Sequence, residues 1–275
     1  MKKILCIVLV LFMMNTASYS YGADYDYDVE ASVRINDSYL YSDTPHILAG
    51  DTVFVVGRYI VEALGGTIEW FEDTQTVRMT LDEKSIEIVI GNIDAEVDGV
   101  AAKLYKAPFI KDGRTMIPLR FVSENFGCQV SWDQTTYTVD ILNPVVEIPE
   151  DYIYERDYTD EDLYLLSKIV TVESGDYSME MAMAIANTVL NRVEHENFPD
   201  TIEGVVYQAN EHVQFPPAHK ASFENLEPKP ISIAAAKKAL EGVNNIEDSL
   251  FFNNRPFVSK SDDLIRVIDG EYFYR

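Results

Sequence analysis

One glutamate stands where a helix is expected to end. Apolar residues recur at helical spacing over 160–173, and Thr159 before three acidic residues is typical of a helix start. Ser174-Gly175 predicts the helix end, so Glu173 lies in its last turn. The helix dipole, apolar neighbours and the acidic composition would raise its carboxyl pKa, which suits a general acid. An ordinary surface glutamate at a helix end fits the same pattern.

Amide and aromatic side chains follow that could line a sugar-binding groove. An apolar stripe predicts a second helix from Ser178 to about Glu196, with Asn187 and Asn191 on the opposite side. These amides would be solvated, would form a second layer behind the site, or would line a groove wall that offers hydrogen bonds to a sugar. Tyr177, Tyr207 and Phe215 could stack on sugar rings, although core packing is the alternative for each.

Histidines offer a different chemistry, a zinc site of the kind that amidases use. The available side chains are His195, His212 and His219, with Glu196 and Glu211 nearby. Their spacing matches no zinc-protease motif, and exposed loop histidines are the simpler interpretation. We therefore expect no metal and no cofactor.

The composition excludes several classes of partner. The chain has 275 residues with 22 Lys and Arg against 46 Asp and Glu, a net charge of −24. Such a surface repels nucleic-acid backbones and anionic lipids, so we expect neither as a partner. The two cysteines supply no disulfide framework and no cysteine zinc site.

The first residues have the order of a secretory signal peptide. Lys2 and Lys3 precede the apolar run Ile4–Met14, and small or polar residues follow. The run is too short to span a bilayer as a helix. We expect residues 1–23 to be removed and the protein to work outside the membrane, secreted or at the cell wall; an uncleaved anchor is the alternative.

The elements that follow divide the chain into a β-rich part and a helical part. Residues 31–142 have strand patterns, residues 143–158 are acidic with two prolines and suit a linker, and residues 159–275 are helical. The β-rich part contains a repeat with an offset of 62, in which Arg58–Trp70 matches Arg120–Trp132. Each copy predicts a strand, a two-turn helix stopped by glycine, and a strand carrying tryptophan.

Residues 45–142 resemble the copper amine oxidase N-terminal-like domain of secreted Gram-positive proteins. The segment Ile117–Glu124 and Trp132 carry this resemblance, whereas the first copy has Val56-Gly57 in place of Pro-Leu. The resemblance implies an accessory module that binds a wall polymer or protein. It implies no oxidase activity and no copper site.

Residues 160–275 resemble the SleB-like cell-wall hydrolases, the spore-cortex-lytic enzyme family. The segments that carry the resemblance are Val172–Gly175, Ala186–Val193, Phe198–Ile202, Val205–Gln208, Gln214-Phe215, Leu250–Asn253 and Tyr272–Tyr274. The resemblance implies a mostly helical, lysozyme-like domain with a small β element. Overall we therefore expect an α+β protein, with the duplicated β-rich accessory domain preceding the catalytic domain.

The resemblance also implies an activity on peptidoglycan glycan strands. Glu173 would act as acid and then base at the bond between N-acetylmuramic acid and N-acetylglucosamine. The muramic acid 6-hydroxyl would attack the anomeric carbon and leave a 1,6-anhydro end. The substrate-binding residues would be Asn187, Asn191, Tyr207, Gln214, Phe215 and Asn253.

The sequence leaves alternatives open. Asp176 or Glu180 could supply the second carboxylate of a hydrolytic glycosidase. A zinc-dependent N-acetylmuramoyl-L-alanine amidase and a non-catalytic wall-binding protein are the two other functions. The sequence departs from the family pattern at Ser174–Asp176 and at Pro216-Pro217, and the second departure leaves the subsite specificity open. The family's usual peptidoglycan-binding module is not expected here, which leaves open whether the target is vegetative wall or spore cortex.

Overall fold

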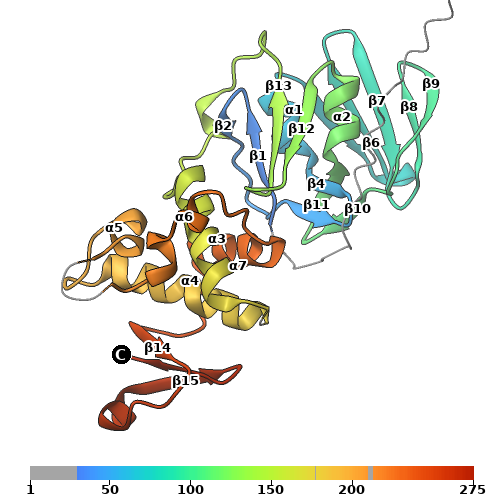
Figure 1. The fold of residues 1–275 in the computed structure, drawn as a ribbon. Helices are drawn as coiled ribbons and strands as arrows, with labels where there is room; N and C mark the ends of the chain where they lie inside the picture. The colour runs from blue at the N-terminus through green and yellow to red at the C-terminus, as the bar shows by residue number, and fades with distance from the viewer. Residues whose placement is uncertain (1–29, 177, 210–212) are drawn as a thin grey trace, which may run out of the picture.

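The computed structural model describes residues 30–176, 178–209 and 213–275, so the predicted signal peptide lies outside the described residues. A β-rich N-terminal region and a helical C-terminal region lie next to each other, and a small sheet follows at the far end (Figure 1). This arrangement confirms the predicted α+β class. Among the described helices, none is both long and apolar enough to cross a membrane.

The strands of the β-rich region pair in the orders β12-β13-β1-β2, β10-β11-β4-β3 and β5-β6-β7-β8-β9. Strand β1 runs parallel to β13, and the other pairs are antiparallel. The strands are β1 Ser32–Ile35, β2 Ser38–Tyr39, β3 Ile47–Ala49, β4 Thr52–Val56, β5 Thr67–Phe71, β6 Thr76–Leu81, β7 Lys84–Val89, β8 Asp94–Val97, β9 Val100–Lys103, β10 Phe109–Lys111, β11 Arg114–Pro118, β12 Gln129–Asp133 and β13 Thr138–Leu142.

The predicted repeat is confirmed in both copies. Strand β4 leads into helix α1 (Gly57–Ala63), and strand β11 leads into helix α2 (Leu119–Asn125). The glycines that follow, Gly65 and Gly127, have φ of 85° and 87°, a left-handed backbone that a side chain would strain. Strands β4 and β11 pair with each other, and both helices bury residues in one core, so the two copies share it.

Residues 143–158 pack against the β-rich region. The Tyr152 hydroxyl donates a 2.6 Å hydrogen bond to Glu62 on α1, and Leu40 pairs with Ile153. Val146 and Ile148 contact the core of the β-rich region. The expected domain boundaries stay predictions, but this segment is held to the surface along part of its length.

Helices α3, α4 and α7 form the framework of the C-terminal region, around a core that also receives Phe215 and Phe273. The elements are α3 Asp160–Ser174, α4 Met179–Glu194, α5 Ile202–Val206, the 3-10 helix η3 Pro216–His219, α6 Ala221–Glu224, α7 Pro230–Leu240, β14 Phe251–Asn253, β15 Leu264–Ile268 and β16 Glu271–Tyr274. Strand β16 lies between β14 and β15.

Helix α7 differs from the sequence prediction at its start. In the sequence, Ser232 before the run Ile233–Glu241 predicts a helix that Ser232 caps, but the helix begins at Pro230 with Lys229 at the cap. Proline suits the first helical turn because its fixed φ is helical and it gives up no hydrogen bond there. Ser232 is buried within the helix.

A buried lysine joins the two regions. Lys237 of α7 is fully buried, and its Nζ donates to Ser32 Oγ at 2.8 Å and to Glu241 Oε1 at 2.6 Å. Arg34 of β1 pairs with Asp160 at the start of α3 at 2.7 Å. Apolar contacts around Tyr137 and Ile233 add to these polar links. The β-rich region and the helical region therefore share a specific interface.

Candidate active site

Helix α3 presents Glu173 in its last turn. A capping box at the helix start, in which Thr159 and Asp162 bond each other's backbone N–H, fixes where the helix begins. The helix ends at Ser174 because Gly175 adopts φ 59° and ψ −116°, a conformation open mainly to glycine. The predicted helix and the position of Glu173 within it are confirmed.

The carboxyl group of Glu173 is half-buried, and burial raises its pKa above the usual range. The charge of Glu271 raises the pKa further, whereas the cations of Arg192 and Lys220 lower it. Oxygen Oε1 is buried and has no hydrogen-bond partner among the described residues. A carboxyl group in these surroundings favours its protonated form and has an oxygen free for a ligand.

Arg192 of α4 is the cation that lowers the pKa of Glu173 most. It is buried, and its Nε donates a 2.8 Å hydrogen bond to the carbonyl of Leu250. Its guanidinium carbon lies 5.1 to 5.8 Å from the ring centres of Phe198, Phe215 and Phe251. Burial lowers its pKa to about 10, so it remains positively charged at neutral pH. Its Nη1 is buried without a partner in the described chain.

Asn187 and Asn191 of α4 bind the protein's own loop. Asn187 Nδ2 donates to Val243 O at 3.0 Å and to Asn245 Oδ1 at 3.1 Å. Asn191 Nδ2 donates to Glu247 O at 2.8 Å and to Ser249 O at 2.9 Å. The expectation of a solvated face or open groove wall is therefore corrected. Residues 243–249 cover this side of α4, so the two amides anchor a loop.

The remaining predicted substrate-binding residues lie in different environments. Phe215 is 1% exposed and packs against Arg192, so its ring is buried and not open to stacking on a sugar. Tyr177 lies outside the described residues. Tyr207 is 41% exposed at the end of α5, beside His219. Gln214 and Asn253 are half-buried, and Asn253 donates to Arg255 O. Among these described residues, only Phe215 is in contact with a group that changes the Glu173 pKa, namely Arg192.

The two carboxylates considered as partners of Glu173 are occupied elsewhere. Asp176 accepts a 2.5 Å hydrogen bond from Lys229, and its side chain is 97% exposed. Glu180 pairs with Arg266 at 2.6 Å. Glu271, which the sequence did not single out, is instead the carboxylate whose charge reaches Glu173.

Metal ligands do not gather in the described chain. Over residues 30–176, 178–209 and 213–275, no group of three or more His, Cys, Asp or Glu side chains could hold a metal ion. His212 and Glu211 of the zinc alternative lie outside those ranges, so a site that includes them stays an alternative. His195 Nδ1 accepts a hydrogen bond from the Asn197 backbone N–H, and the His219 ring lies against Tyr207.

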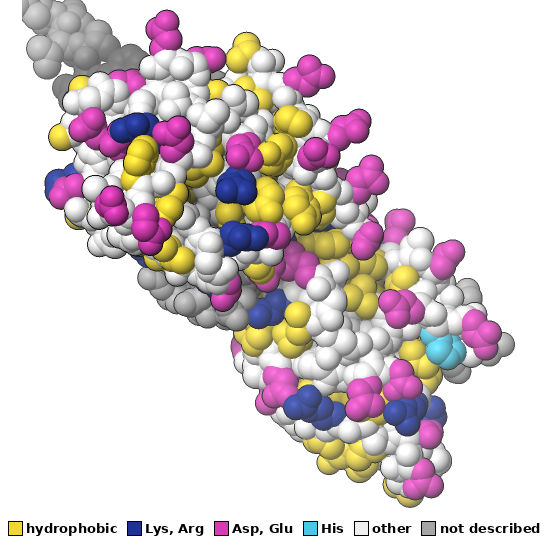
Figure 2. All heavy atoms as spheres, turned by 180° about the vertical axis from the view of Figure 1, so that it is seen from behind, with side chains coloured by type: hydrophobic (Ala, Val, Ile, Leu, Met, Phe, Trp, Pro, Cys, Tyr) yellow, Lys and Arg dark blue, Asp and Glu magenta, His cyan; other side chains and the backbone are white. Residues whose placement is uncertain are grey.

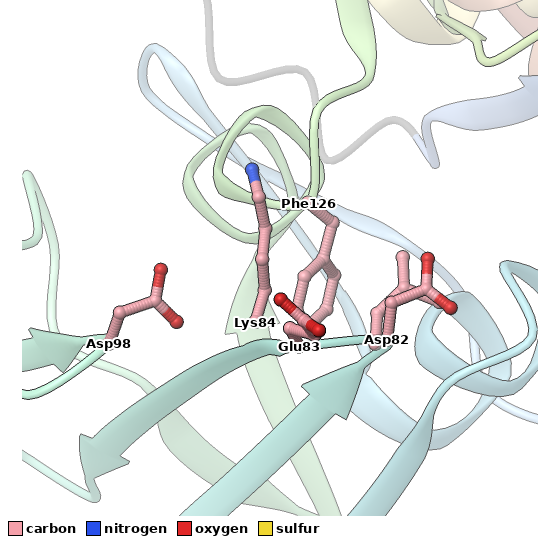
Figure 3. A pocket seen from close by; sticks show the side chains of 6 residues that line it. Asp82, Glu83, Lys84, Asp98 and Phe126 are labelled. Atoms are coloured by element: carbon pink, nitrogen blue, oxygen red, sulfur yellow. The ribbon is translucent and has the colours of Figure 1, made fainter.

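A surface hollow lies in the β-rich region. It is lined by Leu81, Asp82, Glu83, Lys84, Asp98 and Phe126 (Figure 3). Lys84 Nζ donates to the carbonyl of Asn125 and is therefore already engaged at the rim. The hollow lies between the hairpin of β6 and β7, the turn between β8 and β9, and the end of α2, so it is no part of the site around Glu173.

Comparisons with known proteins assign both regions. Residues 178–274 match the family model described as Cell Wall Hydrolase, and residues 34–141 match the Copper amine oxidase N-terminal domain. The chain carries a Cell Wall Hydrolase domain. Both suspected resemblances are thereby confirmed, and the chain is an enzyme that degrades peptidoglycan. Glu173 precedes the matched segment, so its catalytic role is not part of this assignment.

Solved structures with similarity to this chain include two catalytic domains of SleB. One is the germination-specific lytic transglycosylase SleB of Bacillus anthracis, at 23% identity over 44% of this chain and 100% of that chain, with a TM-score of 0.38. The other is the Bacillus cereus SleB protein, at 23% identity over 44% and 94%, with the same TM-score. The comparison with curated proteins finds no match.

Proposed function

We propose that the enzyme cleaves the glycan strand between N-acetylmuramic acid and N-acetylglucosamine as a lytic transglycosylase, with Glu173 as its acid and base. The observation that carries the proposal is the state of Glu173 beside a Cell Wall Hydrolase domain. Its carboxyl is half-buried, its pKa is raised by burial, and its Oε1 has no partner in the described chain.

In the proposed reaction, Glu173 first donates a proton to the substrate and then accepts a proton from it. Glu173 donates its proton to the glycosidic oxygen as the bond from the anomeric carbon to that oxygen breaks. The resulting carboxylate accepts the proton of the muramic acid 6-hydroxyl as that oxygen bonds to the anomeric carbon. The products are a free 4-hydroxyl on N-acetylglucosamine and a 1,6-anhydro end, and no water is consumed.

Arg192 suits the interval between the two proton transfers. Glu173 is then negatively charged in a site that desolvates it, which is unfavourable without a compensating charge. The Arg192 guanidinium acts on Glu173 as a buried cation, and the Leu250 carbonyl and three rings hold it in place. Arg192 is thus a positioning residue that stabilises the carboxylate form.

The acidic surface restricts how the substrate is recognised. Asp and Glu side chains are spread across both regions in Figure 2, and the net charge is −24. Bacterial walls carry anionic polymers, so long-range electrostatic attraction would not bring the enzyme to them. We propose recognition at short range through hydrogen bonds and aromatic contacts, with exposed Tyr207 as one contact.

We also propose that the enzyme works outside the membrane, in remodelling of the vegetative wall or spore cortex. The charged, apolar and small-residue order of residues 1–23 supports export. The accessory region would bind a wall polymer or a wall protein. Fractionation of cells producing the tagged chain tests export, and a shortened form recovered outside the membrane is the expected result.

Mass spectrometry of the products tests the proposed reaction. Purified peptidoglycan is treated with the full chain, with Glu173→Gln and with Glu161→Gln as the matched control. Glu161 lies on the same helix and is exposed. We expect ends one water lighter than reducing ends from the wild type and the control, and none from Glu173→Gln.

Other products would replace the proposal. Reducing ends would mean hydrolysis by an activated water. Free stem peptides with intact glycan, lost on adding a chelator, would indicate the zinc amidase.

A further inference from the structure

The tip of the C-terminal hairpin is fastened next to the end of α3. Asp269, in the turn between β15 and β16, accepts hydrogen bonds from the Ser178 backbone N–H at 3.0 Å and from Ser178 Oγ at 2.5 Å. Ser178 is the N-cap of α4 and stands four residues after the end of α3. The hairpin turn therefore lies against the connection that follows Glu173.

Glu271 is the first residue of β16, directly after this turn. Successive side chains of a strand point to opposite faces, so Glu271 and Phe273 share a face. Phe273 is fully buried in the core formed by α3, α4 and α7. Glu271 therefore points to the side of the small sheet on which the core of α3, α4 and α7 lies.

Glu271 is half-buried and carries no compensating charge. Within the ranges that the structure describes, its side chain makes no ion pair and no hydrogen bond. Burial raises its pKa, and its charge in turn raises the pKa of Glu173. Other carboxylates near the connection, Asp176 and Glu180, each have a basic partner. A carboxylate left unpaired in a partly buried place beside a reactive group calls for a functional reason.

We propose that Glu271 is the second carboxylate of the site and acts through Glu173, favouring its proton-donating form before the glycosidic bond breaks. The proposal rests on the function proposed for Glu173 above. Glu271 is a positioning residue, because it acts on the proton donor through space and takes no part in bond exchange.

The charged groups that act on Glu173 come from two elements and one connection, and they oppose one another. Arg192 on α4 and Lys220, between η3 and α6, favour the carboxylate, whereas Glu271 on β16 favours the acid. A residue that first donates a proton and then accepts one works best when neither form is strongly preferred. The opposed charges supply that balance, since the anion helps the first step and the cations help the second.

The test is the titration of Glu173 itself in the full chain. The carboxyl carbon is followed by NMR in protein labelled with ¹³C-glutamate, and the Glu173→Gln spectrum identifies its signal. Glu271→Gln is compared with Asp262→Asn, which removes one negative charge from an exposed position in the same C-terminal segment. We expect the Glu173 pKa to fall in Glu271→Gln and to remain unchanged in Asp262→Asn.

The rate of glycan cleavage against pH gives a second measure. Because Glu173 must be protonated, loss of Glu271 moves the basic limb of the profile to lower pH, about tenfold in rate above the limb for each unit moved. Glu271→Asp, which keeps the charge, should restore the limb largely to its wild-type position. Circular dichroism confirms that each variant is folded.

Several results would overturn the inference. An unchanged Glu173 pKa in folded Glu271→Gln would show that the charge does not reach Glu173. Loss of rate at all pH values with an unchanged limb would show a structural or substrate-contacting role. Reducing ends that vanish in Glu271→Gln would make Glu271 a base that activates water. If the wild type cleaves no glycan, the proposed function fails, while the NMR titration still decides the inference.

Discussion

Replacing Arg192 with methionine should separate stability from activity. Arg192 is 4% exposed, and methionine fills a similar apolar volume among the same aromatic rings. We expect Arg192→Met to change the free energy of unfolding by less than about 2 kcal/mol and to lower the rate of glycan cleavage at least about tenfold.

The small effect on stability follows from two opposing contributions. Burial lowers the Arg192 pKa to about 10, and at 1.4 kcal/mol per unit this costs the folded state roughly 3 kcal/mol. The hydrogen bond to Leu250 O, at 2.8 Å from a charged donor, returns about 1.5–3 kcal/mol. The contacts with the three rings return about 0.5–2 kcal/mol. The contributions nearly cancel, so removing the guanidinium removes both together.

The effect on rate has no such cancellation. Arg192 is the buried cation that offsets the charge of Glu173 after proton donation. Without it the Glu173 pKa rises, so the residue donates its proton less readily and the basic limb of the pH profile moves to higher pH. This direction is opposite to that expected for Glu271→Gln. Urea denaturation measures stability, and clearing of a peptidoglycan suspension across pH measures the rate.

Arg192→Lys is the control, because it keeps a positive charge in the same place and should retain more activity than Arg192→Met. A folded Arg192→Met with a wild-type rate would refute the electrostatic role. A loss of more than about 4 kcal/mol in the unfolding free energy would refute the balance worked out above.

Three further changes probe the same framework. Gly175→Ala should lower the free energy of unfolding by about 1–3 kcal/mol, because φ 59° and ψ −116° strain any residue with a side chain; urea denaturation measures this loss. The same change should displace Glu173 and lower activity, which a glycan cleavage assay measures. Glu241→Gln should cost on the order of 3 kcal/mol by removing the counter-charge of fully buried Lys237, and added Lys237→Met should recover most of that loss in thermal unfolding. Glu173→Gln should raise the free energy of unfolding by about 0.5–2 kcal/mol at pH 8 but not at pH 3, and urea denaturation curves at both pH values measure it. The reason is that a raised pKa favours the folded state only while Glu173 is protonated, and this contribution is lost as the pH rises through the folded-state pKa.

Much of the fold was predictable because its signals are local. The repeat gave both strand–helix–strand units, since glycine at the helix end and tryptophan in the next strand recur at fixed spacing. Helix α3 was predicted at both ends because a capping box and Gly175 mark them. The start of α7 was misplaced, because Pro230 at the first turn outweighed the capping preference of Ser232. The interface between the regions was not predicted, because Lys237 and Ser32 are 205 positions apart.

The site was predictable only where a single element forms it. Glu173 and its raised pKa followed from one helix and its end, although the structure shows burial as the main cause. Asn187 and Asn191 were placed on the correct side of α4, but periodicity could not show that residues 243–249 cover that side. Glu271 was missed because a lone acidic residue in a short strand carries no motif, and the Asp269–Ser178 contact that brings its hairpin to the end of α3 joins residues 91 positions apart.

The buried polar groups without partners indicate the site around Glu173 independently of any sequence motif. Folded proteins satisfy nearly all buried polar atoms, so an unpartnered group usually has another use. Oε1 of Glu173 and Nη1 of Arg192 are both such atoms, and Glu271 is unpaired among the described residues. Arg192 on α4 and Glu271 on β16 both act on the Glu173 carboxyl group in the last turn of α3. A region shaped for stability alone would have paired the cation with the acids. Leaving them apart around one proton donor is what proton transfer to and from a bound sugar requires.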